Sequence, residues 1–403
     1  MDLDREGRRL LAFARGSVLP GTGFGWLDDH GRIDPTQPVP TYLTARMTHV
    51  FALAALRGEP GAEHLAATGV EALASGPLRD VRYGGWWGAV HRDGTPVPGP
   101  KLAYDHAFVV LAASSAVTAE VPGADALLDD AVAALDRWFL DDRGRVVDSY
   151  PRDLSRPDDY RGANSSMHTV EALLALGDVR SDPRRHAMAL DIAAHLVHEV
   201  AGGFGHRLPE HFGPDWTPLP DYNADRPDDQ FRPYGVTPGH LLEWARLLLQ
   251  LEASLDDPPP WLLADARALF ARAVEIGWAA DGEPGFVYTT DWRDRPVVRS
   301  RMHWVHAEAV ATAAALGRRT GEQGYAAWET VWWQFLLTHF IEEDDPEATA
   351  TAGEPAANWR HELDEHNRPS GRVWSGRPDV YHAYQATLLC QLQTAPSLAV
   401  QLA

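Results

Sequence analysis

A histidine followed three residues later by a glutamate is the most suggestive chemical pattern in the chain. His240 and Glu243 lie in the stretch FRPYGVTPGHLLEWARLLLQ, residues 231–250. Thr237 suits the N-cap and Pro238 the first helical position, and leucines recur at helical spacing beyond them, so a helix is predicted from Pro238. Glu243 then shares a face with His240 and is expected to hydrogen-bond it, fixing the imidazole for proton transfer. The plainer alternative is a local polar pair.

A second histidine has a matching placement. His382 follows Asp379, which is the predicted N-cap of another helix, and therefore takes the third helical position, as His240 does after Thr237. The positive end of a helix dipole opposes protonation of an imidazole. Both histidines are therefore expected to be neutral near pH 7, which suits a general base.

Helical periodicity predicts the elements that position these residues. Twelve helices are expected, at Asp4–Val18, Thr41–Arg57, Ala62–Ser75, Leu102–Ala119, Ala124–Leu140, Ser165–Leu176, Pro183–Val200, Pro238–Leu255, Trp261–Trp278, His303–Leu316, Glu322–Glu342 and Val380–Leu392. Aromatic, glycine-containing segments between them read as short hairpins, at Gly84–Val97, Gly144–Pro151, Gly202–Phe212, Gly285–Val298 and Asn367–Gly376. Such a repeat predicts an all-α fold, an (α/α)6 barrel with β-hairpins at the cavity mouth.

Unusual polar residues gather near the N-terminal ends of the even-numbered helices. Besides His240, Glu243 and His382, they are Arg46, Tyr104, Asp105, Asn164, His168, His306 and Glu308, with Trp304 beside them. Arg46 interrupts an apolar face without a local acid, so we expect it to meet a partner or a ligand oxygen. For His168 a purely local role is an equal alternative, and for His306 an indirect role is as plausible as direct contact. Six parallel inner helices would bring these turns around one polar, aromatic-walled pocket suited to a sugar.

Composition limits the partners of the chain. With 403 residues and no internal linker, one domain over residues 1–403 is expected. The net charge is 36 − 57 = −21, which disfavours nucleic acid and anionic membrane surfaces. Cys390 is the single cysteine, and neither a signal peptide nor an apolar run of membrane-spanning length is found. We expect a soluble cytoplasmic protein, monomeric or homodimeric, with a small-molecule monosaccharide as its ligand.

Cofactor motifs are absent from the sequence. There is no G-x-x-x-x-G-K-[ST] and no G-x-G-x-x-G after a strand, so phosphate-loop and dinucleotide sites are not expected. Two H-x-x-E pairs, His168 with Glu171 and His240 with Glu243, could offer metal ligands, but no further ligand spacing supports them. No metal and no cofactor are predicted.

The chain resembles the N-acylglucosamine 2-epimerase superfamily of (α/α)6 barrels, which includes mannose isomerases, sulfoquinovose isomerases and cellobiose 2-epimerases. The resemblance covers nearly the whole chain. It rests on TARMTHVFALA, KLAYDHAFVVLA, GANSSMHTVEALLAL, FRPYGVTPGHLLEWARLLLQL, HWVHAEAVA and WSGRPDVYHAYQATLL. These segments look closest to the mannose isomerase and sulfoquinovose isomerase branch.

The resemblance implies a function and a set of site residues. His240 and His382 match the acid/base pair, and Arg46, Tyr104, His168, Glu243, Trp304 and His306 match sugar-site positions; Asn164 is added as a further hydroxyl ligand. The implied chemistry opens the sugar ring, removes the proton α to the aldehyde and passes through an enediol without metal or redox cofactor. We expect an aldose–ketose isomerase that converts D-mannose to D-fructose, and also D-lyxose to D-xylulose.

Four alternatives stay open. A sulfoquinovose isomerase would need an added anion site, for which Arg232 and Arg301 are available, and a sugar 2-epimerase would return the proton to C2. A glycoside hydrolase on the same toroid would need two carboxylates flanking a glycosidic bond, with Asp105, Glu243 and Glu308 as candidates. A non-catalytic sugar-binding protein would keep the aromatic rim without needing paired histidines.

Overall fold

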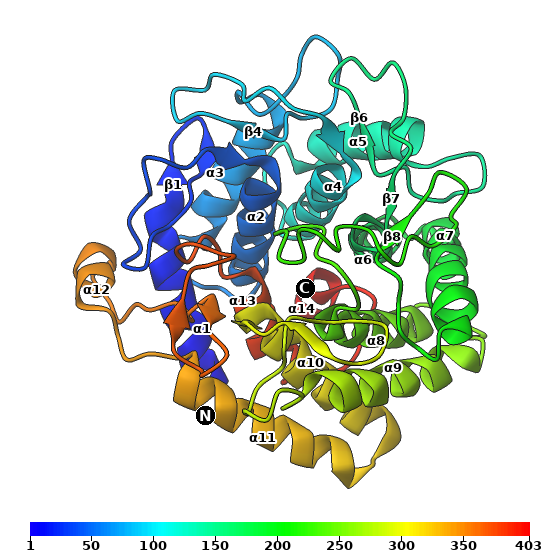
Figure 1. Ribbon diagram of the computed structural model, residues 1–403. Coiled ribbons are helices and arrows are strands. Elements are labelled where there is room, and N and C mark those ends of the chain that lie inside the picture. The colour runs from blue at the N-terminus through cyan, green and yellow to red at the C-terminus, as the bar shows by residue number, and fades with distance from the viewer. The chain divides into compact units, whose positions relative to one another are not determined.

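The computed structural model describes all residues from 1 to 403 and contains the twelve predicted helices (Figure 1). They are α1 (Leu3–Ala14), α2 (Thr41–Leu56), α3 (Ala62–Ala74), α4 (Ala103–Thr118), α5 (Ala124–Ala134), α6 (Ala163–Arg180), α7 (Pro183–Ala193), α8 (Pro238–Ala253), α9 (Trp261–Gly277), α10 (His303–Thr320), α11 (Gln323–His339) and α13 (Tyr381–Leu389). The predicted continuations of α5 and α7 are π-helical, at Leu135–Phe139 and Ala194–Ala201. Two short helices were not predicted, α12 (Pro346–Ala352) and α14 (Leu398–Leu402).

The chain forms two compact units. Unit 1 comprises residues Met1–Leu10, Ala193–Arg377 and His382–Ala395, and unit 2 comprises Leu11–Ile192, Pro378–Tyr381 and Pro396–Ala403. The expected single domain over residues 1–403 stays a prediction. No helix combines the length and the apolar character needed to cross a membrane.

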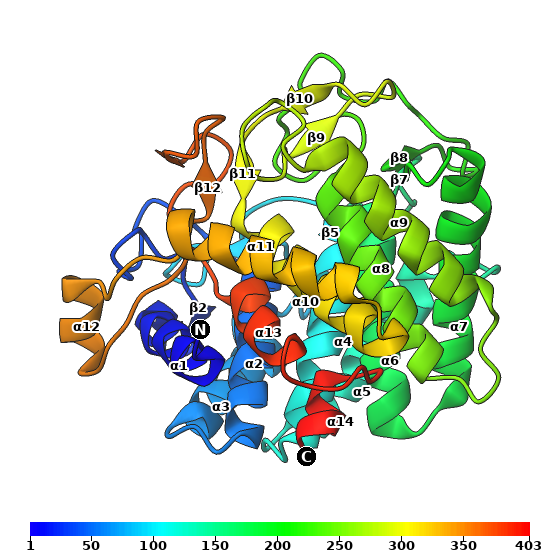
Figure 2. The ribbon, with the colours of Figure 1, turned by 90° about the horizontal axis from the view of Figure 1, so that it is seen from below.

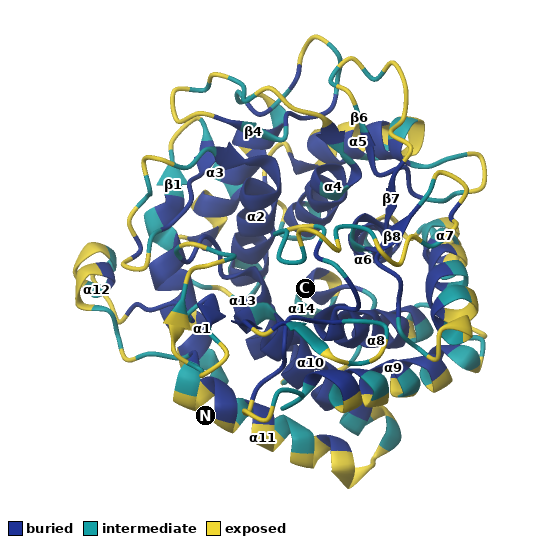
Figure 3. Cartoon of the chain, in the orientation of Figure 1, coloured by how far each residue is buried: buried dark blue, intermediate teal, exposed yellow.

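In unit 2, α2, α4 and α6 are buried on all sides, whereas α3 and α5 bury only one face (Figure 3). α4 packs between α2 and α6, and α3 and α5 cover α2 and α4 from outside. A helix that is apolar all round must be enclosed by its neighbours, whereas a helix with one apolar stripe can face water. The alternation of apolar and amphipathic helices in the sequence thus sets the layers of this unit.

Unit 1 repeats the arrangement with other helices. α8 and α10 are buried nearly throughout and pack on each other, while α9 lies along α8 and α11 along α10 (Figure 2). α11 turns Trp332, Phe335 and Leu336 inward and leaves Val331 and Leu337 exposed. The same alternation of enclosed and outer helices therefore holds here.

The strands are short. They are β1 (Val18–Leu19), β2 (Gly23–Phe24), β3 (Val39–Pro40), β4 (Ala89–Val90), β5 (Lys101–Leu102), β6 (Ser149–Tyr150), β7 (Arg161–Gly162), β8 (His211–Phe212), β9 (Thr289–Thr290), β10 (Pro296–Val298), β11 (Arg301–Met302), β12 (Glu362–Leu363) and β13 (Pro369–Ser370). Only the predicted hairpin at Gly285–Val298 contains both of its paired strands, β9 and β10. In the four others the strand pairs outside the predicted segment, β4 with β3, β6 with β5, β8 with β7 and β13 with β12.

These small sheets hold the N-terminal ends of buried helices. β3, β5 and β11 each lead directly into a helix, and each pairs with a strand from a later loop. The first helical N–H then donates to that loop: Thr41 to Gly88 O (3.0 Å), Ala103 to Asp148 O (2.8 Å) and His303 to His361 O (3.1 Å). Because these N–H groups lack a partner within their helix, the loops replace the side-chain caps that the three helices do not have. The first turn of each helix is thereby fixed in position.

Candidate active site

His240 lies in the first turn of α8, as predicted, but a different carboxylate holds it. Nδ1 of His240 donates to Oε1 of Glu210 at 2.9 Å, and Glu210 is a buried residue of the loop before β8. The prediction that Glu243 holds His240 is wrong, since Glu243 forms an ion pair with Arg246 at 3.5 Å. Thr237 does occupy the N-cap position, but its side chain makes no capping bond. The imidazole is oriented by a distant loop rather than by its own helix.

His382 is the second residue of α13, one position earlier in its helix than predicted. Oδ1 of Asp379 accepts from the N–H of Tyr381 at 3.1 Å, which agrees with its expected capping role. Nδ1 of His382 donates to Oε1 of Glu308 at 3.0 Å, and both side chains are buried. His382 therefore has the same local arrangement as His240, with Nδ1 held by a carboxylate.

The carboxylate beside His382 also carries a buried arginine. Nε of Arg246 donates to Oε2 of Glu308 at 2.7 Å. Burial by itself raises the pKa of Glu308, but Arg246 and His382 outweigh it and lower that pKa below its usual value. Glu308 is therefore an anion at neutral pH and fixes the proton of His382 on Nδ1.

Trp304 lies against both of these histidines. Its ring centroid is 5.2 Å from that of His240 and 5.7 Å from that of His382, with the planes tilted by 35° and 38°. Gly239 makes room for the indole, because a Cβ at this position would lie 2.5 Å from Trp304. The two imidazoles thus flank one aromatic side chain in unit 1.

His306 is placed differently from the sequence expectation that it binds substrate. Its Nδ1 donates to the carbonyl of Met302 at 2.9 Å, and its Nε2 accepts from the N–H of Phe286 at 3.1 Å. Burial lowers the pKa of His306 to about 3. With both ring nitrogens bonded to backbone, His306 ties α10 to the preceding loop and has no nitrogen left for a ligand in this structure.

In unit 2, Arg46 meets both an acid and an aromatic cage. Nη1 of Arg46 lies 3.4 Å from Oδ2 of Asp379, and Nη2 donates to the hydroxyl of Tyr104 at 2.8 Å. Its guanidinium carbon lies 4.4 Å over the ring of Phe108 and 4.8 Å over that of Tyr381. Although burial lowers it, Tyr104 and Asp379 raise the pKa of Arg46 above its ordinary value. The expected partner for this buried cation is therefore present, from a residue remote in sequence.

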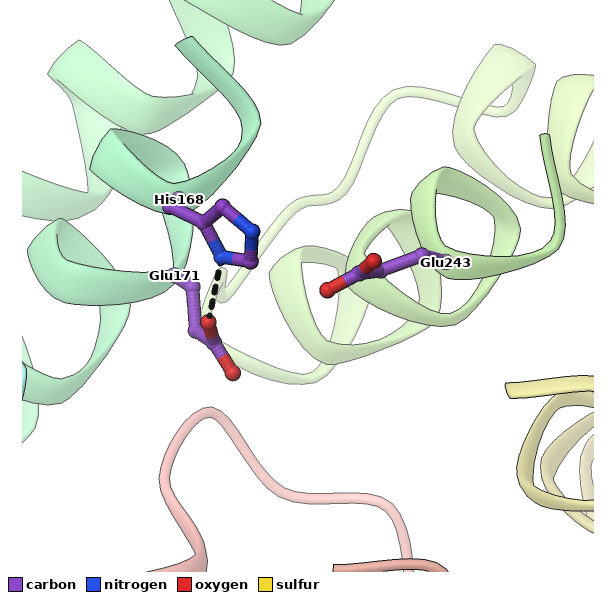
Figure 4. Close-up of side chains that lie close together, drawn as sticks. All are labelled: His168, Glu171 and Glu243. Carbon is purple, nitrogen blue, oxygen red and sulfur yellow. Dashed lines mark hydrogen bonds and ion pairs between the residues drawn. The ribbon is translucent and has the colours of Figure 1, made fainter. Parts of the chain in front are cut away.

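His168 belongs to the same unit and is held by a glutamate of its own helix. Nδ1 of His168 donates to Oε2 of Glu171 at 3.1 Å (Figure 4). The hydroxyl of Tyr381 donates to the same carboxylate at 2.7 Å. The ring of His168 packs 4.5 Å from that of Phe108. Here the two residues at H-x-x-E spacing are bonded to each other, in contrast to His240 and Glu243, although from the sequence this pair was considered only as possible metal ligands.

The second residue is the more open position in the first turn of three buried helices. Tyr104 in α4, Asn164 in α6 and Trp304 in α10 are each half-buried, whereas the residues on either side of them in these turns are buried. Solvent therefore reaches each enclosed helix at its second residue. Each of these three predicted site residues is open at the end of its own helix.

A cluster in unit 1 has the donors for a metal ion. Ligand atoms of Glu243, Glu308 and His382 lie within 4.8 Å of one another, and all three residues are buried. Arg246 donates to Glu308 and pairs with Glu243, so a divalent cation bound here would lie close to a fixed positive charge. The donor set fits the guanidinium better than a metal ion.

Sequence reasoning missed the groups that hold the histidines. Nothing near Glu210 in the sequence points to His240. Arg246 could have been noticed, because it interrupts the apolar run of α8 as Arg46 interrupts that of α2. The argument applied to Arg46, that a buried cation needs a partner, applies equally to Arg246.

Known proteins match the chain over nearly its full length. A model of the N-acylglucosamine 2-epimerase (GlcNAc 2-epimerase) family matches residues 22–386. A D-mannose isomerase of Thermobifida fusca is 52% identical over 403 residues, covering 100% of this chain and 96% of the relative. A D-mannose isomerase of Pseudomonas cannabina pv. alisalensis is 49% identical, covering 99% and 94%. Among solved structures, a D-mannose isomerase crystal structure aligns with a TM-score of 0.86 and 26% identity, covering 96% of each chain.

These matches define the class of protein. It is an isomerase of the all-α (α/α)6 barrel fold, as the sequence predicted. The fold is also shared with the cellobiose 2-epimerase of Spirochaeta thermophila, at a TM-score of 0.82 and 23% identity over 96% of this chain and 94% of that chain. The chain belongs to the N-acylglucosamine 2-epimerase family.

Proposed function

We propose that this protein is an aldose–ketose isomerase that interconverts D-mannose and D-fructose, and D-lyxose and D-xylulose. The observation that carries the proposal is the arrangement of His240 and His382, each held through Nδ1 by a buried glutamate and each beside Trp304. An imidazole with Nδ1–H fixed by a carboxylate uses Nε2 as its proton-accepting atom. The relatives named D-mannose isomerase support the choice of sugar.

The reaction needs two proton carriers and no net redox change. Ring opening moves the anomeric hydroxyl proton to the ring oxygen and frees the aldehyde. A base then removes the proton on C2, and the C2–H electron pair forms the C1=C2 double bond of the enediol while the C1 oxygen takes up a proton. A proton returned to C1 as the hydroxyl on C2 loses its own then gives the ketose. In the proposal His240 and His382 carry these protons. Arg46, Tyr104, Asn164, His168 and Glu243 are proposed as ligands of the sugar oxygens, and Trp304 as an apolar contact.

The alternatives have less support. Arg301 cannot serve a sulfonated sugar, because it is fully buried and bound in bidentate fashion by Asp281 at 2.7 and 2.8 Å. A glycoside hydrolase needs carboxyl groups that face a glycosidic bond. Glu308 instead binds His382 and Arg246, and Glu210 binds His240. In unit 1 these two carboxylates serve histidines, which favours isomerisation.

Product analysis in D₂O tests the function. We expect D-mannose to give mainly D-fructose, with deuterium at C1 where the transferred proton has exchanged with solvent, and D-glucose at most slowly. NMR follows each product directly. Glucose appearing first would identify a 2-epimerase, and rapid sulfoquinovose turnover without mannose turnover would identify the sister activity.

We also propose that catalysis is independent of metal. Because Arg246 lies where a cation would bind Glu308 and Glu243, exhaustive EDTA treatment is expected to leave kcat nearly unchanged. Activity that EDTA abolishes and that Mn²⁺, Co²⁺ or Zn²⁺ restores would contradict this. We further propose a cytoplasmic enzyme that acts as a monomer or homodimer, which cell fractionation and light scattering would test.

A further inference from the structure

The pairs His240–Glu210 and His382–Glu308 differ in whether the glutamate also binds a cation. Glu210 makes its one side-chain hydrogen bond to His240, and no arginine or lysine pairs with it. Oε1 of Glu308 accepts from His382 at 3.0 Å, and the guanidinium of Arg246 contacts both oxygens, with Nε 2.7 Å from Oε2 and Nη2 3.4 Å from Oε1. Two otherwise similar imidazoles therefore face different net charges.

Arg246 is built rigidly into α8. It is 1% exposed, and its Nη1 donates to Oε1 of Gln250, one turn further along the helix, at 2.6 Å. Nε2 of Gln250 in turn donates to the carbonyl of Ala395 at 3.0 Å. Nη2 of Arg246 lies 3.4 Å from Glu308 and 3.5 Å from Glu243. The guanidinium is thus fixed by groups on both sides and presents its Nε edge to Glu308.

We propose that Arg246 is a positioning residue for His382, an inference that rests on the proposed isomerase function. Arg246 holds Glu308 so that one carboxylate oxygen faces Nδ1 of His382, and it balances the charge of that carboxylate. His382 consequently loses its proton at a lower pH than it would beside an isolated carboxylate, and is ready as a base at neutral pH.

The charged groups around His382 support the inference that Arg246 offsets the charge of Glu308. A lone carboxylate stabilises an imidazolium, whereas a guanidinium on the same carboxylate offsets that attraction. From α10, Glu308 and His303 face His382, and the rings of His303 and His382 are 6.5 Å apart. From α8, Glu243 and Arg246 face it. Asp379, three residues earlier in the chain, is paired with Arg46. Arg246 is thus the cation that directly neutralises the carboxylate bound to His382.

The pH profile of kcat/KM for D-mannose tests the inference. Arg246→Gln should move the acid limb upward by about one pH unit or more, with most of the activity regained at higher pH. Arg246→Lys keeps the charge, so its acid limb should stay near that of the wild type even though kcat falls. Arg319→Gln is the matched control: Arg319 also binds a glutamate, Glu252, in bidentate fashion (2.7 and 2.9 Å), but near the C-terminal end of α10. Its acid limb should not move.

A second comparison removes the risk that a lone buried Glu308 prevents folding. Glu308→Gln and the double variant Arg246→Gln/Glu308→Gln both lack the carboxylate, and only the first retains the buried cation. The acid limb of the double variant should lie about one unit above that of Glu308→Gln. Equal acid limbs in this pair, or an unmoved limb in a folded Arg246→Gln, would overturn the proposal and leave Arg246 a purely structural role.

The outcome can be separated from failure of the proposed function. If the wild type does not convert mannose, the proposed function fails. The titration of His382 can then be followed by NMR of its Cε1 proton, assigned by comparison with His382→Gln, in the same variants. The same upward shift in Arg246→Gln is expected there, and its absence would refute the role of Arg246 independently of substrate.

Discussion

Four of the five histidines in the first turns of α4, α8, α10 and α13 divide into two kinds by the partner of Nδ1. His240 in α8 and His382 in α13 donate from Nδ1 to buried glutamates. His106 in α4 and His306 in α10 donate from Nδ1 to the carbonyl four residues earlier, at 2.7 and 2.9 Å. Residue type and approximate place in the helix are shared, so the bonding partner decides which histidines can take part in proton transfer.

His106 and His306 have both ring nitrogens hydrogen-bonded to backbone. Nε2 of His106 accepts from the N–H of Trp86 at 3.3 Å, as Nε2 of His306 does from Phe286. Burial lowers the pKa of both to about 3, so both stay neutral at physiological pH. Each joins its helix to the loop before it. These residues build the scaffold and offer no nitrogen to a substrate.

Position within the turn explains the division. In α4 and α10 the half-buried second residues are Tyr104 and Trp304, and the fourth residues are His106 and His306. Successive residues of an α-helix are rotated by about 100°, so the second and fourth residues point to different sides. One turn can therefore carry a ligand-facing residue on one side and a structural histidine on the other.

The largest expected effect comes from removing the histidines held by glutamate. His240→Ala and His382→Ala should each lower kcat by at least about a hundredfold, because a general acid or base contributes roughly 10²- to 10⁴-fold. Steady-state kinetics with D-mannose measures this, and circular dichroism should show an unchanged helical content. His64→Ala, at an exposed position on α3, provides a control that should retain full activity. A folded variant with near-wild-type turnover would remove that histidine from the mechanism.

A smaller effect is expected when Trp304 is displaced from between the two imidazoles. Gly239→Ala places a Cβ about 2.5 Å from the indole, so the ring must shift. Because misplacing an active-site group by about 1 Å can cost up to roughly a hundredfold in rate, kcat should fall at least about tenfold.

Gly324→Ala is the matched control for Gly239→Ala. Gly324 is also the second residue of a helix, α11, but nothing lies within 4 Å of a Cβ added there. Kinetics of the two variants side by side separates crowding of Trp304 from the general effect of replacing a helical glycine. Equal kcat values in the two variants would show that the position of Trp304 has no bearing on catalysis.

The helices could be read from the sequence because their signals are local. The starts of α8 at Pro238 and of α10 at His303 agree with those predicted from hydrophobic spacing and capping residues. The strand pairs were harder to predict, since β4 pairs with β3, some fifty residues earlier. Strands of two residues carry almost no periodicity, so their pairing with strands of other loops was not predicted.

The bonds of the site likewise differ in whether their partners are close together or far apart in the sequence. The pair of His168 with Glu171 lies one turn apart on α6 and was predictable from spacing. Glu210 reaches His240 from a loop, and Glu308 reaches His382 from another helix, so no local pattern encodes either bond. The assignment of site residues to one mechanism came from the family resemblance and remains a prediction.

The smallest expected effects concern the stability of the protein when His106 or His306, the two histidines bonded to backbone, is replaced. His306→Asn keeps a donor for the carbonyl of Met302 but leaves the N–H of Phe286 without its acceptor. A buried donor left unsatisfied costs about 1–3 kcal/mol, so the free energy of unfolding at pH 7 should fall by that amount. His106→Asn should behave alike. Urea unfolding measures both, and His64→Asn, at an exposed position, should change stability little.

The pH dependence of that stability follows from the lowered pKa values. An unfolded histidine takes up its proton near pH 6.5, whereas folded His106 and His306 do so only near pH 3. Between these values the unfolded state binds more protons, so each histidine makes the free energy of unfolding fall by up to about 1.4 kcal/mol per unit as the pH is lowered. Below about pH 3 the contribution is fully lost, and above 6.5 it is fully present. Urea unfolding at pH 7, 6 and 5 should therefore give a shallower decline in His306→Asn than in the wild type. Parallel declines would mean that folded His306 binds its proton as readily as an unfolded histidine. The distinction between His306 as a structural histidine and His240 and His382 as proton carriers would then fail.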